Sequence, residues 1–183
     1  AEVPLTAMHR DDVLDGSSLP LRYVSHTPAF RREAGAAGVE TRGLQRVHQF
    51  DKVEIYTFSE PTNSYNELET MRRHAEAALR ALGLPYRVLE LCAGDLGFTA
   101  SKTYDLEVWA PGVRSWLEVS SISNCEAFQA RRARTRARSP GSSRTTHVHT
   151  LNGSALGMAR TMAAILENGQ NADGTVNIPE ILQ

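Results

Sequence analysis

The sequence predicts an α+β fold with a mainly antiparallel sheet and helices gathered on one face. Strand-like runs follow one another with short turns between them, whereas regular alternation of strands and helices would indicate a parallel sheet. The 183 residues are 41% hydrophobic and 22% charged, which is typical of one globular domain.

Two helices are expected, one before and one after a series of four strands along the chain. The first runs from about Ser64 to Leu82, because Leu, Met and Ala side chains recur at helical spacing and a glycine and a proline follow. Ser64 and Glu67 predict a capping box at its start. The second is expected from Ala155 to Asn168, with Gly169 ending it.

A strand is expected from Arg46 to Phe58, and it has an unusual polar face. A strand places every second side chain on the same side. The side chains on this face are Arg46, His48, Phe50, Lys52 and Glu54. They form either a solvated sheet surface or a binding surface with a cation, an aromatic ring and a carboxylate in line. The further strands expected are Tyr86–Cys92, Thr103–Trp109, Trp116–Ser121 and Phe128–Arg136.

The net charge of −1 hides an uneven distribution. Residues 127–166 contain seven arginines and no acid, so this stretch carries +7 and the rest of the chain −8. The asymmetry indicates either a local anionic partner or a solvated basic edge.

Several function classes lack sequence support. No apolar run approaches the roughly 20 residues of a membrane helix, so no membrane partner is expected. Neither G-x-G-x-x-G nor G-x-x-x-x-G-K-[ST] occurs, so the sequence does not support a Rossmann or Walker nucleotide site. Cys92 and Cys125 are too few for a disulfide framework, and we expect both to be buried in a cytoplasmic protein.

Several motifs follow one another along the chain. Residues 30–54 contain F-R-x-E, a loop and T-R-G-L-x-R-x-H-Q-F-x-K-x-E. They are followed by KTYDLEVW at 102–109, EVSSISN at 118–124, FQARR at 128–132 and TLNGSALGMAR at 150–160. This order resembles the bacterial seryl-tRNA synthetase family, a member of the class II aminoacyl-tRNA synthetases. The first segment resembles that family's motif 2, the next three its core strands, and the last its motif 3.

The resemblance implies ATP and L-serine as substrates, with Mg²⁺ and without zinc. It makes Arg31 and Arg160 the catalytic residues, and it places Phe50 against the adenine ring. The implied ATP-binding residues are Arg31, Arg32, Glu33, Arg46, Val47, Phe50, Glu118, Val119, Ser120, Ser121 and Arg160. The implied serine-binding residues are Ala1, Glu2, Glu54, Asn152 and Ser154. Glu118 and Ser121 are the implied positions for Mg²⁺ bound through ATP.

The implied activity is formation of seryl-adenylate and pyrophosphate, followed in the full-length protein by seryl transfer to tRNA(Ser). Residues 1–183 correspond to a catalytic core without the family's N-terminal tRNA-binding helical arm and motif 1, so we expect a fragment of a longer, homodimeric protein. Two alternatives remain open at this point. One is an inactive synthetase-like binding module, and the other is an amino acid ligase that charges a carrier protein.

Overall fold

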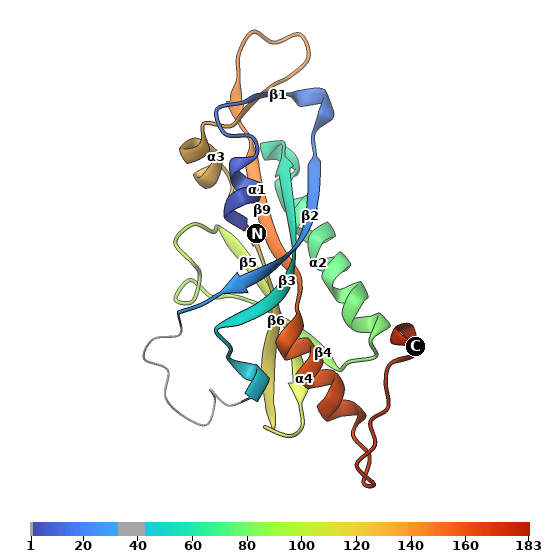
Figure 1. Ribbon diagram of the computed structural model, residues 1–183. Coiled ribbons are helices and arrows are strands. Elements are labelled where there is room, and N and C mark those ends of the chain that lie inside the picture. The colour runs from blue at the N-terminus through green and yellow to red at the C-terminus, as the bar shows by residue number, and fades with distance from the viewer. Residues whose placement is uncertain (1, 33–42) are drawn as a thin grey trace.

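The computed structural model describes residues 2–32 and 43–183, and it has the predicted α+β architecture (Figure 1). In these residues one sheet has six strands in the order β2-β3-β9-β6-β5-β4, and every neighbouring pair is antiparallel. Its strands are β2 (Leu21–Phe30), β3 (Gln49–Ser59), β4 (Tyr86–Glu90), β5 (Lys102–Ala110), β6 (Ser115–Asn124) and β9 (His149–Gly157).

A smaller sheet and several helices complete the described part of the chain. The small sheet consists of β1 (Val13–Asp15), β7 (Arg136–Arg138) and β8 (Thr146–His147). The α-helices are α1 (Glu2–Ala7), α2 (Ser64–Ala81), α3 (Phe128–Ala133) and α4 (Met158–Gly169). Short 3-10 helices cover Gly16–Ser18, Gly43–Gln45, Pro61–Asn63 and Glu180–Leu182. No helix in the described residues is long and apolar enough to cross a membrane.

The two long helices pack against the same face of the large sheet, as predicted. Leu68 and Leu79 of α2 and Ala164 of α4 belong to one buried cluster with strand residues such as Leu106 and Leu151. Close packing inside this cluster requires glycine at position 153 of β9. A Cβ atom there would lie 2.8 Å from the Ile122 side chain of β6, which is far inside van der Waals contact.

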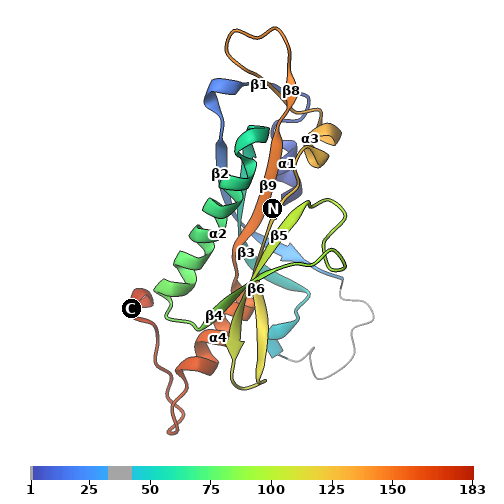
Figure 2. The same cartoon turned by 180° about the vertical axis from the view of Figure 1, so that it is seen from behind.

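The two short helices α1 and α3 pack against the opposite face, beside the start of β9 (Figures 1 and 2). Leu5 of α1 and Ala130 of α3 form a second buried cluster with Tyr56 and Phe58. Both aromatic residues lie on the same side of β3 as Glu54, since strand side chains alternate. This face is therefore covered at one end of the sheet by two short helices.

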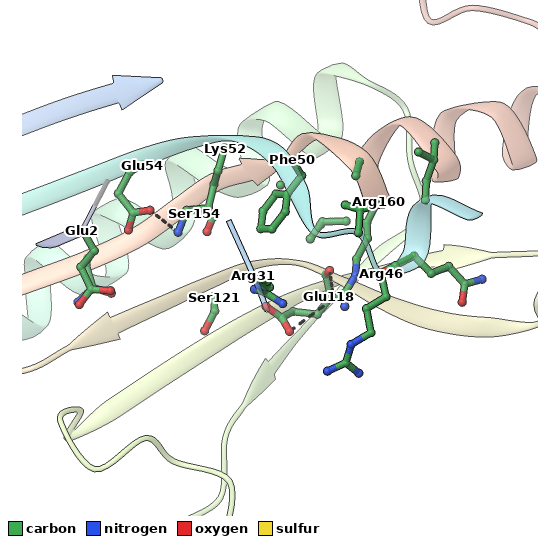
Figure 3. A pocket seen from close by; sticks show the side chains of 17 residues that line it. Glu2, Arg31, Arg46, Phe50, Lys52, Glu54, Glu118, Ser121, Ser154 and Arg160 are labelled. Carbon is green, nitrogen blue, oxygen red and sulfur yellow. Dashed lines mark hydrogen bonds and ion pairs between the residues drawn. The ribbon is translucent and has the colours of Figure 1, made fainter. Parts of the chain in front are cut away.

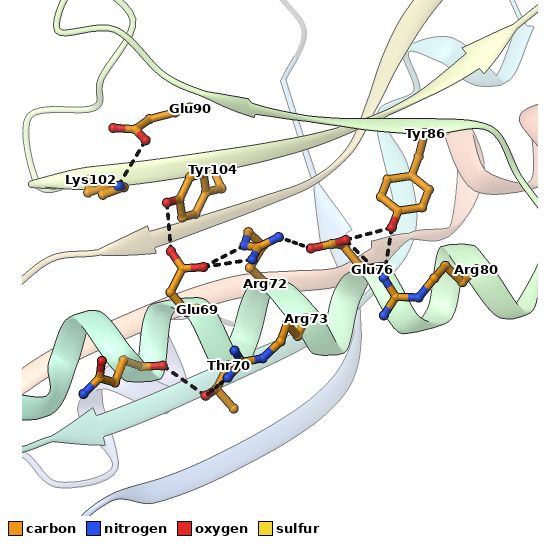
Figure 4. Close-up of polar contacts among 11 residues, drawn as sticks. Glu69, Thr70, Arg72, Arg73, Glu76, Arg80, Tyr86, Glu90, Lys102 and Tyr104 are labelled. Atoms are coloured by element: carbon orange, nitrogen blue, oxygen red, sulfur yellow. Dashed lines mark hydrogen bonds and ion pairs between the residues drawn. The ribbon is translucent and has the colours of Figure 1, made fainter.

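Polar contacts also join α2 to strands β4 and β5 (Figure 4). The Tyr104 hydroxyl donates to Glu69 Oε1 at 2.8 Å, and the Tyr86 hydroxyl donates to Glu76 Oε2 at 2.7 Å. Arg72 lies between the two carboxylates and bonds to both. These contacts hold α2 in place against β4 and β5.

The predicted helix Ser64–Leu82 is confirmed as α2, but its predicted capping box is wrong. The Ser64 hydroxyl donates to the Pro61 carbonyl and bonds to His149 Nδ1 at 2.8 Å. Glu67 instead receives two hydrogen bonds from the Arg22 guanidinium, at 2.8 and 2.9 Å. Tertiary partners thus take both side chains away from the helix terminus.

The second helix begins three residues later than predicted. Residues 155–157 continue β9, because its ladder with β3 extends to the pair Lys52 and Gly157. Helix α4 therefore starts at Met158, and Ser154 lies within a strand. This places Ser154 directly opposite Glu54 in the antiparallel pair.

The predicted strand Phe128–Arg136 is wrong. Its first six residues form α3, since Gln, Ala and Arg favour helix and Ala130 is buried against the sheet. Arg134 has a left-handed backbone conformation with φ of 56°, which ends the helix before β7. Cys125 is buried as expected, whereas Cys92 is exposed because it lies in the loop after β4.

Candidate active site

A cavity of about 230 Å³ opens on the same sheet face as α1 and α3, in the part that these two helices do not cover (Figure 3). Strands β3, β6 and β9 form its floor, and the 3-10 helix Gly43–Gln45 and the start of α4 border it. The cavity contains most of the described residues that the sequence resemblance assigned. They are Glu2, Arg31, Arg46, Val47, Phe50, Glu54, Glu118, Val119, Ser121, Asn152, Ser154 and Arg160.

One end of the cavity is polar and acidic. Glu54 from β3 and Ser154 from β9 face each other across the strand pair, and Glu2 approaches from α1. The Lys52 ammonium lies 2.5 Å from Glu54 Oε2. This end therefore offers two carboxylates, a hydroxyl and a cation to a small polar ligand.

Glu54 has the most constrained environment of these groups. Its residue is 1% exposed. Burial raises the pKa of the Glu54 carboxyl, while the hydrogen bond and charge of Lys52 act against that rise and the nearby Glu2 adds to it. A ligand ammonium at this end would favour the carboxylate form in the same way as Lys52 does.

The other end of the cavity is aromatic and cationic. Phe50 lies two positions before Lys52 on the same strand face, and the Arg31 guanidinium carbon is 5.1 Å from the centre of its ring. The Arg31 amide donates to the His48 carbonyl at 2.8 Å, so the β2–β3 pairing continues beyond Phe30 and holds Arg31 beside β3. An aromatic ring with an adjacent guanidinium suits a planar base that carries anionic groups.

Arg160 closes this end from the first turn of α4. Its guanidinium donates to the Gln45 carbonyl at 2.9 Å and to the Glu118 carbonyl at 2.8 Å, and it lies 3.7 Å from Glu118 Oε2. An arginine on an apolar helix often only extends along the protein surface. These bonds to two other elements instead hold Arg160 over the cavity.

Oxygen atoms gather where β6 lines the cavity. Glu118 and Ser121 line it, and Asp105 pairs with Ser121 across the strands. Asp105 Oδ1 is buried without a hydrogen-bond partner among the described residues. Burial raises the pKa of Asp105, and Glu118 adds to that rise. Within residues 2–32 and 43–183, no group of three or more His, Cys, Asp or Glu side chains is placed to hold a metal ion.

Two assigned residues in the described part of the chain lie elsewhere, and two others are not described. Arg32 is exposed and is not among the residues that line the cavity. Ser120 is buried on the other side of β6, where its hydroxyl donates to the Ser154 carbonyl. Ala1 and Glu33 lie outside the described residues.

Sequence reasoning missed Lys52 as a site residue, together with smaller contributions from Leu44, Gln45, Gly157 and Ala159. Lys52 had a usable signal, because it lies between Phe50 and Glu54 in the alternating polar face. Leu44 and Gln45 line the cavity because they lie in the 3-10 helix, and Gly157 and Ala159 because α4 begins beside it. No sequence pattern indicated either position.

Comparison with known proteins agrees with this geometry. A sequence profile described as "tRNA synthetase class II core domain (G, H, P, S and T)" matches residues 1–169. The chain belongs to the class II tRNA synthetase core family. It is 61% identical over its whole length to a serine--tRNA ligase of Roseiflexus sp. (strain RS-1), of which it covers 43%. The chain thus spans less than half the length of the curated relatives it matches.

Solved structures of family members have the same fold. The seryl-tRNA synthetase of Pyrococcus horikoshii complexed with ATP superposes with a TM-score of 0.94 at 49% identity, over 98% of this chain and 40% of the other. The cytoplasmic serine-tRNA ligase of Naegleria fowleri in complex with AMP gives 0.93 at 37% identity, over 100% of this chain and 43% of the other. These two relatives bind adenine nucleotides.

Proposed function

We propose that this synthetase core activates L-serine with ATP, giving seryl-adenylate and pyrophosphate. The observation that carries the proposal is that one cavity joins the Phe50 end to the Glu54 end. The two residues are four positions apart on β3, which corresponds to about 13 Å along a strand. That span suits a nucleotide at the aromatic end and a small amino acid at the acidic end.

The reaction needs no protein base. The serine carboxylate is already ionised at neutral pH, so its oxygen can attack the α-phosphorus directly. The new bond between this oxygen and the α-phosphorus forms as the bond between the α-phosphorus and the oxygen bridging to the β-phosphate breaks. Pyrophosphate leaves with the bridging oxygen. The protein then has to align two anionic reactants and offset their charge. Arg31 and Arg160 are the guanidinium groups at the nucleotide end that would do so.

The oxygen atoms on β6 fit Mg²⁺. Magnesium prefers oxygen ligands, and it is usually held by one or two carboxylates together with substrate phosphates and water. Glu118 offers a carboxylate and Ser121 a hydroxyl on the cavity wall. When bound there, Mg²⁺ would supply positive charge to the phosphates.

The acidic end would select serine through its polar groups. Glu54 and Glu2 suit an ammonium and a hydroxyl, and Ser154 offers a further hydroxyl. Alanine would leave such buried groups without partners and should be strongly disfavoured, whereas threonine should be disfavoured only modestly by its extra methyl group. In the longer protein, the seryl group would pass to tRNA(Ser), and we expect that protein to act as a homodimer.

Calorimetric titration of the chain with two sulfamoyl adenosine analogues tests the proposal. One carries a seryl group and the other an alanyl group, and both mimic the aminoacyl-adenylate without reacting. We expect ATP to bind and the seryl analogue to bind at least about tenfold more tightly than the alanyl analogue. Equal affinity for the two analogues would contradict serine specificity. Failure of the folded chain to bind ATP would contradict the whole proposal.

A further inference from the structure

Gln129 connects the acidic end of the cavity to the buried sheet. It lies on α3 and does not line the cavity. Its Nε2 donates to Glu2 Oε1 at 2.7 Å. Its Oε1 accepts from the Tyr56 hydroxyl at 2.9 Å and from the Thr150 hydroxyl at 2.8 Å. One side chain thus joins a carboxylate on α1 to hydroxyls on β3 and β9.

The Glu2 carboxylate determines which way the Gln129 amide points, because it can only accept, whereas a hydroxyl can donate or accept. A carboxamide has one oxygen that accepts and one nitrogen that donates. With Oε1 toward the two hydroxyls, the nitrogen faces Glu2 and all three contacts are favourable. The flipped amide would place Oε1 against the Glu2 carboxylate, where two acceptors repel. The Glu2 contact therefore fixes the amide orientation, and the two hydroxyls then donate to Oε1.

The anchor of this network is fully buried, whereas Glu2 lies at the first position of a short helix. Tyr56 and Thr150 are fully buried in neighbouring strands. Glu2 begins a helix of six residues, in which Leu5 is the buried residue. A glutamate side chain in such a position has several rotamers available. A donor that holds one carboxylate oxygen leaves the other oxygen available to the cavity.

We propose that Gln129 is a positioning residue for amino acid recognition, which orients Glu2 toward the serine without touching it. This inference rests on the proposed function, because it assigns Glu2 to serine binding. It predicts that the Gln129 side chain affects affinity at the acidic end of the cavity and leaves the nucleotide end, marked by Phe50, unchanged.

The variant Gln129→Glu tests this with almost no change in shape. Its carboxylate can still accept from both hydroxyls, but it repels Glu2 instead of donating to it. Thr150→Val removes one of the two hydroxyl bonds that hold the amide oxygen and leaves the contact with Glu2 in place. Gln170→Glu is the matched control, since it adds the same charge at an exposed position outside the cavity.

Each variant is titrated with ATP and with the seryl sulfamoyl adenosine analogue, and its melting temperature is recorded. We expect Gln129→Glu to bind the analogue about tenfold or more weakly while its ATP affinity stays within about twofold, because a hydrogen bond to a charged group is lost. Thr150→Val should show a smaller loss of the same kind, and Gln170→Glu should match the original chain.

The double variant Glu2→Gln with Gln129→Glu restores a donor and an acceptor across the contact, so its melting temperature should return to that of the original chain. Unchanged analogue affinity in folded Gln129→Glu would overturn the inference and leave the proposed function intact. Equal losses for ATP and the analogue would also overturn it, because they would indicate a general structural role. Failure of the original chain to bind either ligand would instead contradict the proposed function.

Discussion

Replacing Glu54 with Gln should weaken serine binding by one to two orders of magnitude and leave ATP binding nearly unchanged. Glu54 is 1% exposed and faces the acidic end of the cavity. The amide keeps the shape of the side chain and loses its charge. A buried hydrogen bond to a charged group contributes roughly 1.5 to 3 kcal/mol, which corresponds to about a 10- to 150-fold change in affinity.

The variant should remain folded. The Glu54→Gln substitution leaves the Lys52 ammonium without its carboxylate partner, but 23% of the Lys52 side chain is exposed and can bind water. Burial also disfavours the charge on Glu54, as the raised pKa of its carboxyl indicates. The substitution removes that desolvation cost, which offsets part of the lost ion pair.

The assay is calorimetric titration of L-serine in the presence of a non-hydrolysable ATP analogue, followed by titration of ATP alone. Glu180→Gln is the matched control, because Glu180 is exposed near the end of the chain and does not line the cavity. An equal loss of ATP and serine affinity in Glu54→Gln would refute the reasoning. Unchanged serine affinity would refute it as well.

Three further outcomes are expected. Phe50→Ala should weaken ATP binding by about 1 to 3 kcal/mol through loss of base stacking, measured by calorimetry. Arg31→Gln and Arg160→Gln should abolish pyrophosphate exchange, whereas Arg138→Gln, outside the cavity, should leave it nearly intact. Burial lowers the pKa of His149 in the folded state. The unfolded chain therefore binds more protons below about pH 6.5, and the free energy of unfolding should fall as the pH drops from there to the folded pKa.

Each of these has a contradicting result. Unchanged ATP affinity in folded Phe50→Ala would reject its role as the adenine platform. Equal losses in the cavity arginines and in Arg138 would mean that the catalytic charges are misplaced. For His149, urea denaturation of the original chain and His149→Gln at several pH values provides the comparison. Identical pH dependence of their unfolding free energies would show that the histidine is not responsible.

The features that sequence predicted well are those with a strong local pattern. Period-two alternation placed Phe50 and Glu54 on one strand face, and that face lines the cavity. Helical periodicity located α2 within a residue at its end. The antiparallel sheet followed from short connections between strands. In each case the local pattern and the tertiary environment favour the same structure.

The errors arose where tertiary contacts outweigh local preference. Residues 155–157 look helical by their spacing, but β3 pairs with them and extends β9. Ser64 and Glu67 fit a capping box, yet His149 and Arg22 bind them. The role proposed for Gln129 had no signal in the sequence pattern, because it depends on three partners that are distant in sequence.

Exchange of labelled pyrophosphate into ATP measures whether this cavity activates serine. We expect exchange by this chain that depends on L-serine, is weaker with threonine and is close to background with alanine or glycine. Equal exchange with alanine and with serine would contradict the claim that this cavity activates serine. The absence of serine-dependent exchange by a folded chain that binds ATP would contradict it as well.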